Sequence, residues 1–238
     1  MNNSKKAIAI TGASRGLGLV MTREFLAAGD TVYALVRGGG GKELSALLPR
    51  FPDTLVTVPC DVGSTESVGR AAEEVKARTN HLDMLVNNAG VNFDMGHVVD
   101  FTQTDFDEME KTFNINTVGV MRVVKAFDPL LREGSWSVAI SSGAGSITRN
   151  PATEVEIAYR VSKTALNMAF RLYGNTVRKR KVRTLLVDPG WMRTAMGGPG
   201  ATCDPEENGR LIVSLLKSAD TLSEDVLFVD FNGKEVPW

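Results

Sequence analysis

Residues 8–18 read Ile8-Ala9-Ile10-Thr11-Gly12-Ala13-Ser14-Arg15-Gly16-Leu17-Gly18 and join a short apolar run to a segment with helical character. Gly12 permits a tight turn after a strand, Gly16 lets the backbone approach a pyrophosphate, and Gly18 allows close packing of a helix on a strand. The free N–H groups at the start of the following helix favour phosphate. A tight turn needs glycine without any ligand as well, but the position in the first strand–helix unit favours a phosphate-binding turn.

Outward from this turn, short apolar runs alternate with segments of helical character along the whole chain. Strands are predicted at Lys6–Thr11, Thr31–Arg37, Thr54–Cys60, Leu82–Asn87, Ser135–Ser141, Arg183–Asp188 and Val226–Val229. Helices are predicted at Gly16–Ala28, Ser64–Thr79, Asp105–Arg132, Val155–Lys179 and Pro205–Ser218. Runs that are nearly all apolar are typical of strands covered on both faces. The pattern therefore predicts a single α/β domain over residues 1–238, with a doubly wound Rossmann-type fold and a mainly parallel seven-stranded sheet.

The segment Trp191–Asp204 lacks the periodicity of a strand or a helix and follows a predicted strand. A long loop at this position is where an open α/β sheet places a substrate lid, so it is expected to be a substrate loop. Within it, Trp191, Met192 and Met196 either form an adaptable apolar wall for a substrate or pack inside the loop.

Composition excludes several classes of function. The formal charge of −1, with 43% hydrophobic and 23% charged residues, is typical of a soluble globular protein and gives no reason to expect a nucleic-acid partner. No signal peptide or membrane span is recognisable, so a cytoplasmic protein without membrane association is expected. The chain has two His (His81, His97) and two Cys (Cys60, Cys203), none at metal-ligand spacing. Free thiols and no metal site are predicted, and proton chemistry is expected from Tyr, Lys, Asp or Glu.

Further motifs follow the glycine turn. Cys60-Asp61-Val62 ends the third predicted strand, and Asn87-Asn88-Ala89-Gly90 follows the fourth. Tyr159-x-x-x-Lys163 and Asp188-Pro189-Gly190 come later. Together with the turn, these motifs resemble those of the short-chain dehydrogenase/reductase family, in the family's order and over nearly the whole chain.

This resemblance implies a nicotinamide cofactor. Asp61 is similar to the family's aspartate that touches the adenine, and Thr194 is similar to the threonine that touches the carboxamide. The residues implied to bind the cofactor are Gly12, Ser14, Arg15, Gly16, Leu17, Gly18, Arg37, Asp61, Val62, Asn88, Ala89, Gly90, Tyr159, Lys163, Pro189, Gly190, Met192 and Thr194.

Two arginines indicate which nicotinamide cofactor is bound. An NAD site commonly carries an acidic residue after the second strand, but here that strand ends in Arg37. Arg15 lies inside the glycine turn, near the same place. Guanidinium groups bind a phosphate dianion through charge-assisted hydrogen bonds, although either arginine could instead be a solvated surface residue. The pair predicts NADP(H).

Tyr159 and Lys163 are four residues apart and share one face of a predicted helix. Tyrosine titrates near about 10 in water, too high for efficient acid–base chemistry at neutral pH. A nearby ammonium and the oxidised nicotinamide ring would stabilise the phenolate and lower that pKa. We therefore expect Tyr159 to exchange the hydroxyl proton while the cofactor carries hydride.

The family also uses a serine that orients the carbonyl and an asparagine in a helix. Ser142 follows the fifth predicted strand, 17 residues before Tyr159, whereas Ser146 lies 13 residues before it, the more usual family separation. Ser142 is favoured because the end of the strand fixes its position, and Ser146 stays an alternative. Asn116, followed by Gly119, resembles the family's asparagine better than Asn114 does, and a simple helix kink is the other interpretation.

A finer resemblance, through Tyr159–Asn167, Met196-Gly197-Gly198 and Gly233-x-x-x-Pro237-Trp238, points to the carbonyl reductases related to the C-factor and sniffer proteins. It implies NADPH-dependent reduction of a small-molecule ketone or aldehyde, with Asn116, Ser142, Tyr159 and Lys163 as the catalytic residues. The alternatives are a non-catalytic NADP-binding sensor and an alcohol dehydrogenase that works in the oxidative direction.

The predicted helix after Tyr159 carries Ala165, Leu166, Met168, Ala169 and Leu172. This face is either core or the seam of a homodimer or homotetramer, because the wider family often dimerises through this helix. Of the two histidines, only His97 is expected near enough to the cleft to influence substrate binding.

Overall fold

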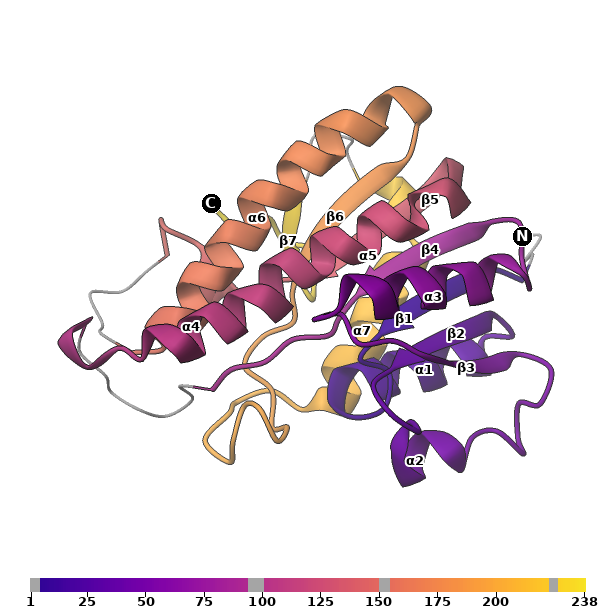
Figure 1. The fold of residues 1–238 in the computed structure, drawn as a ribbon, viewed down its shortest axis with the longest axis horizontal. Coiled ribbons are helices and arrows are strands. Elements are labelled where there is room, and N and C mark those ends of the chain that lie inside the picture. Colours follow the sequence, from indigo (N-terminus) through magenta and orange to yellow (C-terminus); the bar gives the residue numbers. More distant parts are fainter. Residues whose placement is uncertain (1–4, 94–100, 150–154, 223–226) are drawn as a thin grey trace.

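Seven parallel strands form the centre of the molecule in the computed structural model, which describes residues 5–93, 101–149, 155–222 and 227–238 (Figure 1). The strand order is β3-β2-β1-β4-β5-β6-β7, and every neighbouring pair is parallel. The strands are β1 (Ala7–Thr11), β2 (Thr31–Val36), β3 (Leu55–Pro59), β4 (Leu82–Asn87), β5 (Leu131–Ile140), β6 (Arg183–Asp188) and β7 (Phe228–Asp230). The predicted doubly wound, seven-stranded Rossmann-type sheet is confirmed, and it is entirely parallel.

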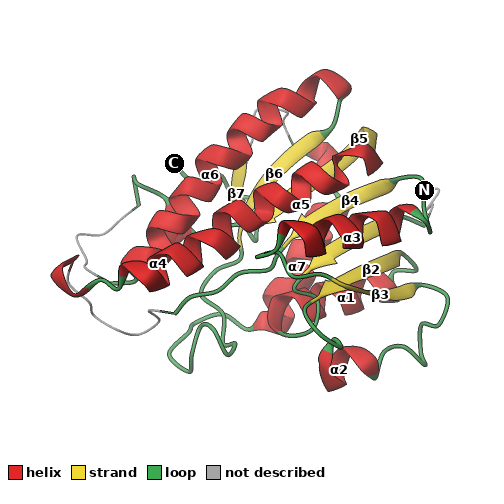
Figure 2. Cartoon of the chain, in the orientation of Figure 1, coloured by secondary structure: helices red, strands yellow, loops and turns green. Residues whose placement is uncertain are grey.

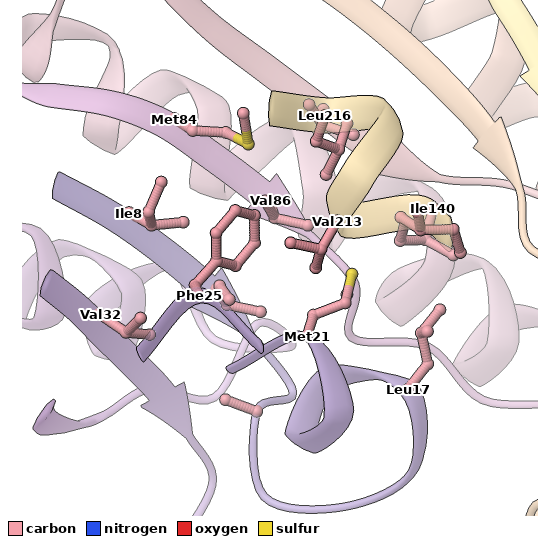
Figure 3. Close-up of a cluster of buried hydrophobic side chains, with 14 of the residues drawn as sticks. Ile8, Leu17, Met21, Phe25, Val32, Met84, Val86, Ile140, Val213 and Leu216 are labelled. Carbon is pink, nitrogen blue, oxygen red and sulfur yellow. The ribbon is translucent and has the colours of Figure 1, made fainter. Parts of the chain in front are cut away.

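Helices cover both faces of this sheet (Figure 2). The α-helices are α1 (Gly16–Ala27), α2 (Gly41–Ser45), α3 (Thr65–Lys76), α4 (Phe106–Phe113), α5 (Val120–Phe127), α6 (Ile157–Val177) and α7 (Pro205–Lys217). On β1, Ile8 and Ile10 join a buried cluster with side chains of α1 and α7, among them Phe25 and Val213 (Figure 3). Ala9 points to the other face, into a cluster with α3, α5 and α6. The continuous apolar runs are thus explained by burial of both faces.

One predicted helix is wrong in its interior and at its end. The segment expected to be a single helix over Asp105–Arg132 contains a π-helix at Asn114–Gly119 between α4 and α5. A 3-10 turn then leads into β5, which begins at Leu131 rather than at Ser135. The wide turn places Gly119 against the segment that follows β3. A Cβ on Gly119 would lie only 3.1 Å from the carbonyl oxygen of Val62.

The strand order reverses between β1 and β4, so the connections that leave their carboxyl ends diverge, and this is the usual place for a ligand in such sheets. Around this edge lie Thr11, Asn87, Ile140 and Asp188, the last residues of β1, β4, β5 and β6. Among the described residues, no group of His, Cys, Asp and Glu could hold a metal ion, and no helix is long and apolar enough to span a membrane. Cys60 and Cys203 are both free.

Candidate active site

The glycine turn and the Asn-Asn-Ala-Gly motif are in direct contact. The side-chain amide of Asn88 donates to the carbonyl oxygens of Thr11 (2.9 Å) and Gly12 (3.2 Å). Gly12 has a φ of +66°, and a Cβ at this position would lie 2.9 Å from the Cα of Ala89. A Cβ at Gly18 would lie 2.2 Å from the carbonyl oxygen of Gly12. Glycine is therefore required at both positions by close approach of the backbone.

The substitution Gly18→Ala is expected to destabilise the fold by about 1–3 kcal/mol, since the added methyl group overlaps the backbone of the turn. Gly69 is the matched control, because it also lies in a helix and nothing lies within 4 Å of its Cβ position. Gly69→Ala is expected to stabilise the protein by about 0.5–1 kcal/mol through helix propensity. Denaturant unfolding measures both changes, and equal effects at the two positions would contradict the packing argument.

Helix α1 begins at Gly16 without a capping side chain, and its first turn holds no acidic residue. Its N–H groups and positive dipole end therefore suit an anion. A Cβ at Gly16 would lie 3.7 Å from the methyl carbon of Thr194, so the residue expected at the carboxamide lies beside the residue expected at the pyrophosphate. Ser14, Leu17 and Gly18 belong to this same turn and helix start.

Arg15 and Arg37 are both exposed, and within the described part of the chain neither side chain forms an ion pair or a hydrogen bond. Arg37 directly follows β2, and Gly38–Gly40 lead from it into α2, so no acidic side chain occupies the place of the NAD-type carboxylate. Two unneutralised guanidinium groups fit a phosphate and do not fit a site selective for an unphosphorylated ribose.

Asp61 and Val62 follow β3. The Asp61 carboxylate accepts a hydrogen bond from the backbone N–H of Gly63 (2.9 Å), which fixes the turn before α3. Val62 is buried, and its carbonyl oxygen accepts from Arg122 (3.3 Å). Both residues stand at the carboxyl end of a strand, as the family resemblance requires.

The segment after β6 is held in place from two sides. Asn208, in α7, donates to the carbonyl oxygen of Pro189 (2.8 Å), and the backbone of Met192 forms an isolated bridge with Cys203. Gly190 has a φ of +76°, and a Cβ on it would lie 3.0 Å from the Cys203 sulfur. The segment has no helix or regular strand, and internal contacts such as the hydrogen bond from the Trp191 indole to Gly197 (2.9 Å) order it; its role as a substrate loop stays a prediction.

Tyr159, Lys163 and Ser142 meet where α6 packs against the end of β5. The Ser142 hydroxyl lies near enough to the Tyr159 phenol to act on its pKa in the lowering direction. The Lys163 ammonium donates to the carbonyl oxygen of Ile140 (2.9 Å) and lies 5.6 Å from the centre of the Tyr159 ring. The four-residue spacing on α6 puts both side chains on the face that points to β5.

The two candidate serines have different partners. The hydroxyl oxygen of Ser142 accepts from the backbone N–H of Ala144 (3.1 Å), so its hydrogen is free to point toward Tyr159. Ser146 is buried, donates to the carbonyl oxygen of Pro237 (2.6 Å) and accepts from the Arg149 N–H (3.0 Å). The structure thus brings Ser142, and not Ser146, to the tyrosine.

Burial governs the ionisation of this group. It raises the pKa of Tyr159 to about 12, although the Ser142 hydroxyl acts in the lowering direction. Burial also lowers the pKa of Lys163 to about 8, partly opposed by the negative charge of Asp188. The predicted lowering of the Tyr159 pKa includes the charge of the oxidised cofactor, whereas in the protein alone burial raises this pKa, because loss of hydration disfavours both charged forms.

The substitution Lys163→Met is expected to stabilise the protein at pH 7 by about 1–3 kcal/mol, because each unit of pKa shift corresponds to about 1.4 kcal/mol. A lysine with a pKa lowered to about 8 binds fewer protons when folded than when unfolded, so its penalty is complete below pH 8 and fades toward pH 10.5. Denaturant unfolding at several pH values should therefore show the advantage of the variant shrinking across this range. The exposed Lys179 is the control, and Lys179→Met should show no such trend.

Asn116 lies in the π-helix and is completely buried. Its side-chain amide donates to the Val91 carbonyl oxygen and accepts from the Val91 N–H, both at 2.8 Å. A Cβ on Gly90 would lie 3.3 Å from the Asn116 oxygen and 3.8 Å from the Lys163 nitrogen, so both side chains approach Gly90. Asn114 instead binds Arg122 (2.8 Å), away from this point.

Sequence reasoning did not identify Ser141, Asn167 or Glu156 as part of the site. Ser141 donates to the Asn167 side chain, and Glu156 accepts from Asn92 (2.9 Å) next to Tyr159. The position of Asn167, one helical turn after Lys163, is the signal that could have identified it. His97 lies outside the described residues.

The arrangement of these motifs has a counterpart among known proteins. Residues 6–202 match the sequence model of the short chain dehydrogenase family. The chain belongs to this family. The C-signal protein of Myxococcus xanthus is one relative within the family, 38% identical over 164 residues, which cover 67% of this chain and 95% of the relative.

Solved structures of the family agree with the fold throughout. The NADPH-bound carbonyl reductase from chicken fatty liver has a TM-score of 0.86 at 28% identity, with 98% of this chain and 99% of that chain covered. The carbonyl reductase Sniffer of D. melanogaster has a TM-score of 0.88 at 26% identity, with 98% and 100% covered. The resemblance to C-factor and sniffer proteins within the family is confirmed.

Proposed function

We propose that this protein reduces the carbonyl group of a small-molecule ketone or aldehyde with NADPH. The observation that carries the proposal is the Ser142 hydroxyl near the Tyr159 phenol, with Lys163 beside the tyrosine ring, at the sheet edge that also holds the glycine turn. This set combines a proton donor with a hydrogen-bond donor for a carbonyl oxygen.

The residues present fit NADP(H). The uncapped start of α1 suits the pyrophosphate, the exposed Arg15 and Arg37 suit the additional phosphate, and Thr194 lies beside Gly16. Neither Gly12 nor Gly18 has space for a Cβ atom, and a turn packed this closely is what a cofactor-binding turn needs. NADPH and NADP also occupy related structures, the chicken enzyme and a Burkholderia multivorans protein 30% identical to this chain. When bound, the cofactor supplies the hydride.

Tyr159 gives the proton to the carbonyl oxygen of the substrate. With its pKa raised to about 12 in the protein alone, the phenol keeps its proton at neutral pH and is present in the form that a proton donor needs. Ser142 donates its hydroxyl hydrogen to the same oxygen and polarises the carbonyl. Its own oxygen already accepts from Ala144, so the donor orientation is preset.

Lys163 holds the cofactor ribose and supplies positive charge near the tyrosine. Its hydrogen bond to Ile140 fixes the ammonium between β5 and α6. Asn116 supports the route by which a proton returns to Tyr159, since its oxygen approaches Gly90, as the Lys163 nitrogen does. It also holds the backbone of Val91 through two hydrogen bonds.

The test is NADPH consumption, followed by absorbance, across aldehydes, diketones, quinones and keto esters, with NADH measured in parallel. Turnover with at least one class, faster with NADPH, is the expected result. Binding of NADPH without turnover across the whole panel would overturn the proposal in favour of a sensor protein. Turnover of alcohols with NADP but of no carbonyl would favour an oxidative dehydrogenase.

A further inference from the structure

Ser142 stands on a short turn whose own hydrogen bonds are few. The residue itself is extended, with a φ of −167°, and a 3-10 turn over Gly143–Gly145 follows it. Within the turn, the Gly145 N–H donates to the Ser142 carbonyl oxygen (2.9 Å), and the Ala144 N–H donates to the Ser142 hydroxyl. These local bonds shape the turn but do not fix its position relative to Tyr159, which is on α6.

One buried side chain connects both sides of this turn to α6. The Asn167 oxygen accepts from the Ser141 hydroxyl (2.5 Å), immediately before Ser142. The Asn167 nitrogen donates to the carbonyl oxygen of Gly145 (3.2 Å), at the end of the turn. Asn167 is only 3% exposed, so neither bond competes with bulk water. An amide supplies one acceptor and two donors on a rigid plane, which suits this double contact.

The turn also presses directly on the catalytic helix. A Cβ on Gly145 would lie 2.8 Å from the backbone carbon of Lys163, so glycine allows the turn to lie flat against α6. Thr164 adds a second hydrogen bond to the Gly145 oxygen (3.0 Å). Thr164 and Asn167 thus both connect Gly145 to α6, whereas the Ser141 hydroxyl binds Asn167.

We propose that Asn167 is a positioning residue, which sets the geometry of the Ser142–Tyr159 pair by holding both sides of the Ser142 turn on the helix that carries the tyrosine. The inference rests on the proposed function of this site and names a residue outside its four catalytic groups. A hydrogen bond to a transition state weakens steeply when its donor moves, so a small shift of Ser142 lowers turnover more than binding.

The first test is steady-state kinetics of Asn167→Ala, Ser141→Ala and the double variant. Asn167→Ala is expected to lower kcat by about tenfold to a hundredfold, with the Kd for NADPH within about twofold of the parent. The double variant should lose little beyond Asn167→Ala, because the two side chains act through one contact. Asn167→Asp keeps the acceptor for Ser141 but sets a carboxylate oxygen against the Gly145 carbonyl oxygen, so it should lower kcat as well.

Ser135→Ala is the matched stability control. Ser135 is buried at the opposite end of β5, where its hydroxyl donates to Leu82 (2.7 Å) and accepts from Arg132 (3.0 Å). This variant should lose stability comparable to that of Asn167→Ala and keep the parental kcat. An Asn167→Ala protein with parental kcat, or independent losses in Ser141→Ala and Asn167→Ala that add fully, would overturn the proposal.

A second readout needs no turnover. In protein labelled with carbon-13 on the tyrosine rings, NMR gives signals from Tyr33, Tyr159 and Tyr173. The signal that is absent in Tyr159→Phe belongs to Tyr159. Asn167→Ala should move the Tyr159 signal and leave that of Tyr33 unchanged, whereas Ser135→Ala should move neither. If the parent reduces no carbonyl but this shift is seen, the proposed function has failed and the positioning role stands. No shift in Asn167→Ala counts against the positioning role.

Discussion

Replacing Tyr159 with Phe is expected to lower kcat for carbonyl reduction by about 10²–10⁴-fold, the usual contribution of a positioned general acid. The change removes one oxygen and leaves the ring, so α6 and its packing on β5 are preserved. Ser142 still offers a hydrogen bond to the carbonyl oxygen but has no proton to transfer at neutral pH. Binding of NADPH should persist, because Lys163 and the glycine turn are untouched.

Fluorescence titration with NADPH, beside steady-state kinetics, separates these two effects. Tyr173→Phe is the matched control, because Tyr173 also lies on α6 and its hydroxyl donates to Asp128 (3.3 Å), on the helical segment before β5. That variant is expected to keep the parental kcat. Turnover by Tyr159→Phe close to that of the parent would refute the mechanism, whereas loss of NADPH binding would indicate a structural defect.

The substitution Arg37→Asp is expected to weaken NADPH binding by on the order of 10²-fold, with a much smaller effect on NADH. A charge-assisted hydrogen bond contributes about 1.5–3 kcal/mol, and the new carboxylate repels the phosphate. Because Arg37 is exposed, the effect should shrink as salt concentration rises. Titration of both cofactors at two ionic strengths measures the selectivity and its screening.

Arg50→Asp serves as the charge-matched comparison. Arg50 is exposed, lies over the Phe51 ring (5.6 Å) and precedes the amino end of β3, opposite the edge that holds the site. It changes the net charge equally and should leave the ratio of the two cofactor affinities unchanged. Equal weakening of NADPH and NADH by Arg37→Asp would remove the basis for NADP preference.

The sheet was predictable because its strands are buried on both faces and therefore read as short apolar runs. The elements with the strongest patterns, such as β4 and β6, agree with the predicted bounds. The wide turn at Asn114–Gly119 was not predictable, since one additional residue in a turn hardly disturbs an apolar pattern. The start of β5 was not predicted either. After Leu131, the residues Arg132–Gly134 are exposed and do not form an apolar run, and the pairing of β5 with β4 shifts register between Leu82 and Met84.

Within the site, Tyr159 and Lys163 were accessible from sequence because they depend only on spacing along one helix. Ser142 was favoured from its place at the end of a strand, but what holds Ser146 elsewhere, the Pro237 carbonyl from the far end of the chain, was not predictable. The raised pKa of Tyr159 in the protein alone was not predictable either. Spacing shows the neighbouring ammonium, but the amount of hydration lost appears only once the fold is formed.

The π-helix at Asn114–Gly119 lies between α4 and α5 and holds Asn116. A π-turn holds one more residue than an α-turn for nearly the same rotation, so loss of one residue from this place would leave an ordinary α-helical turn. The apolar side of α5, with Val123 and Phe127, would stay in the core, but the wide turn that presents Asn116 to Val91 would be gone. A single-residue deletion here is therefore expected to spare the packing and to remove the contact of the asparagine.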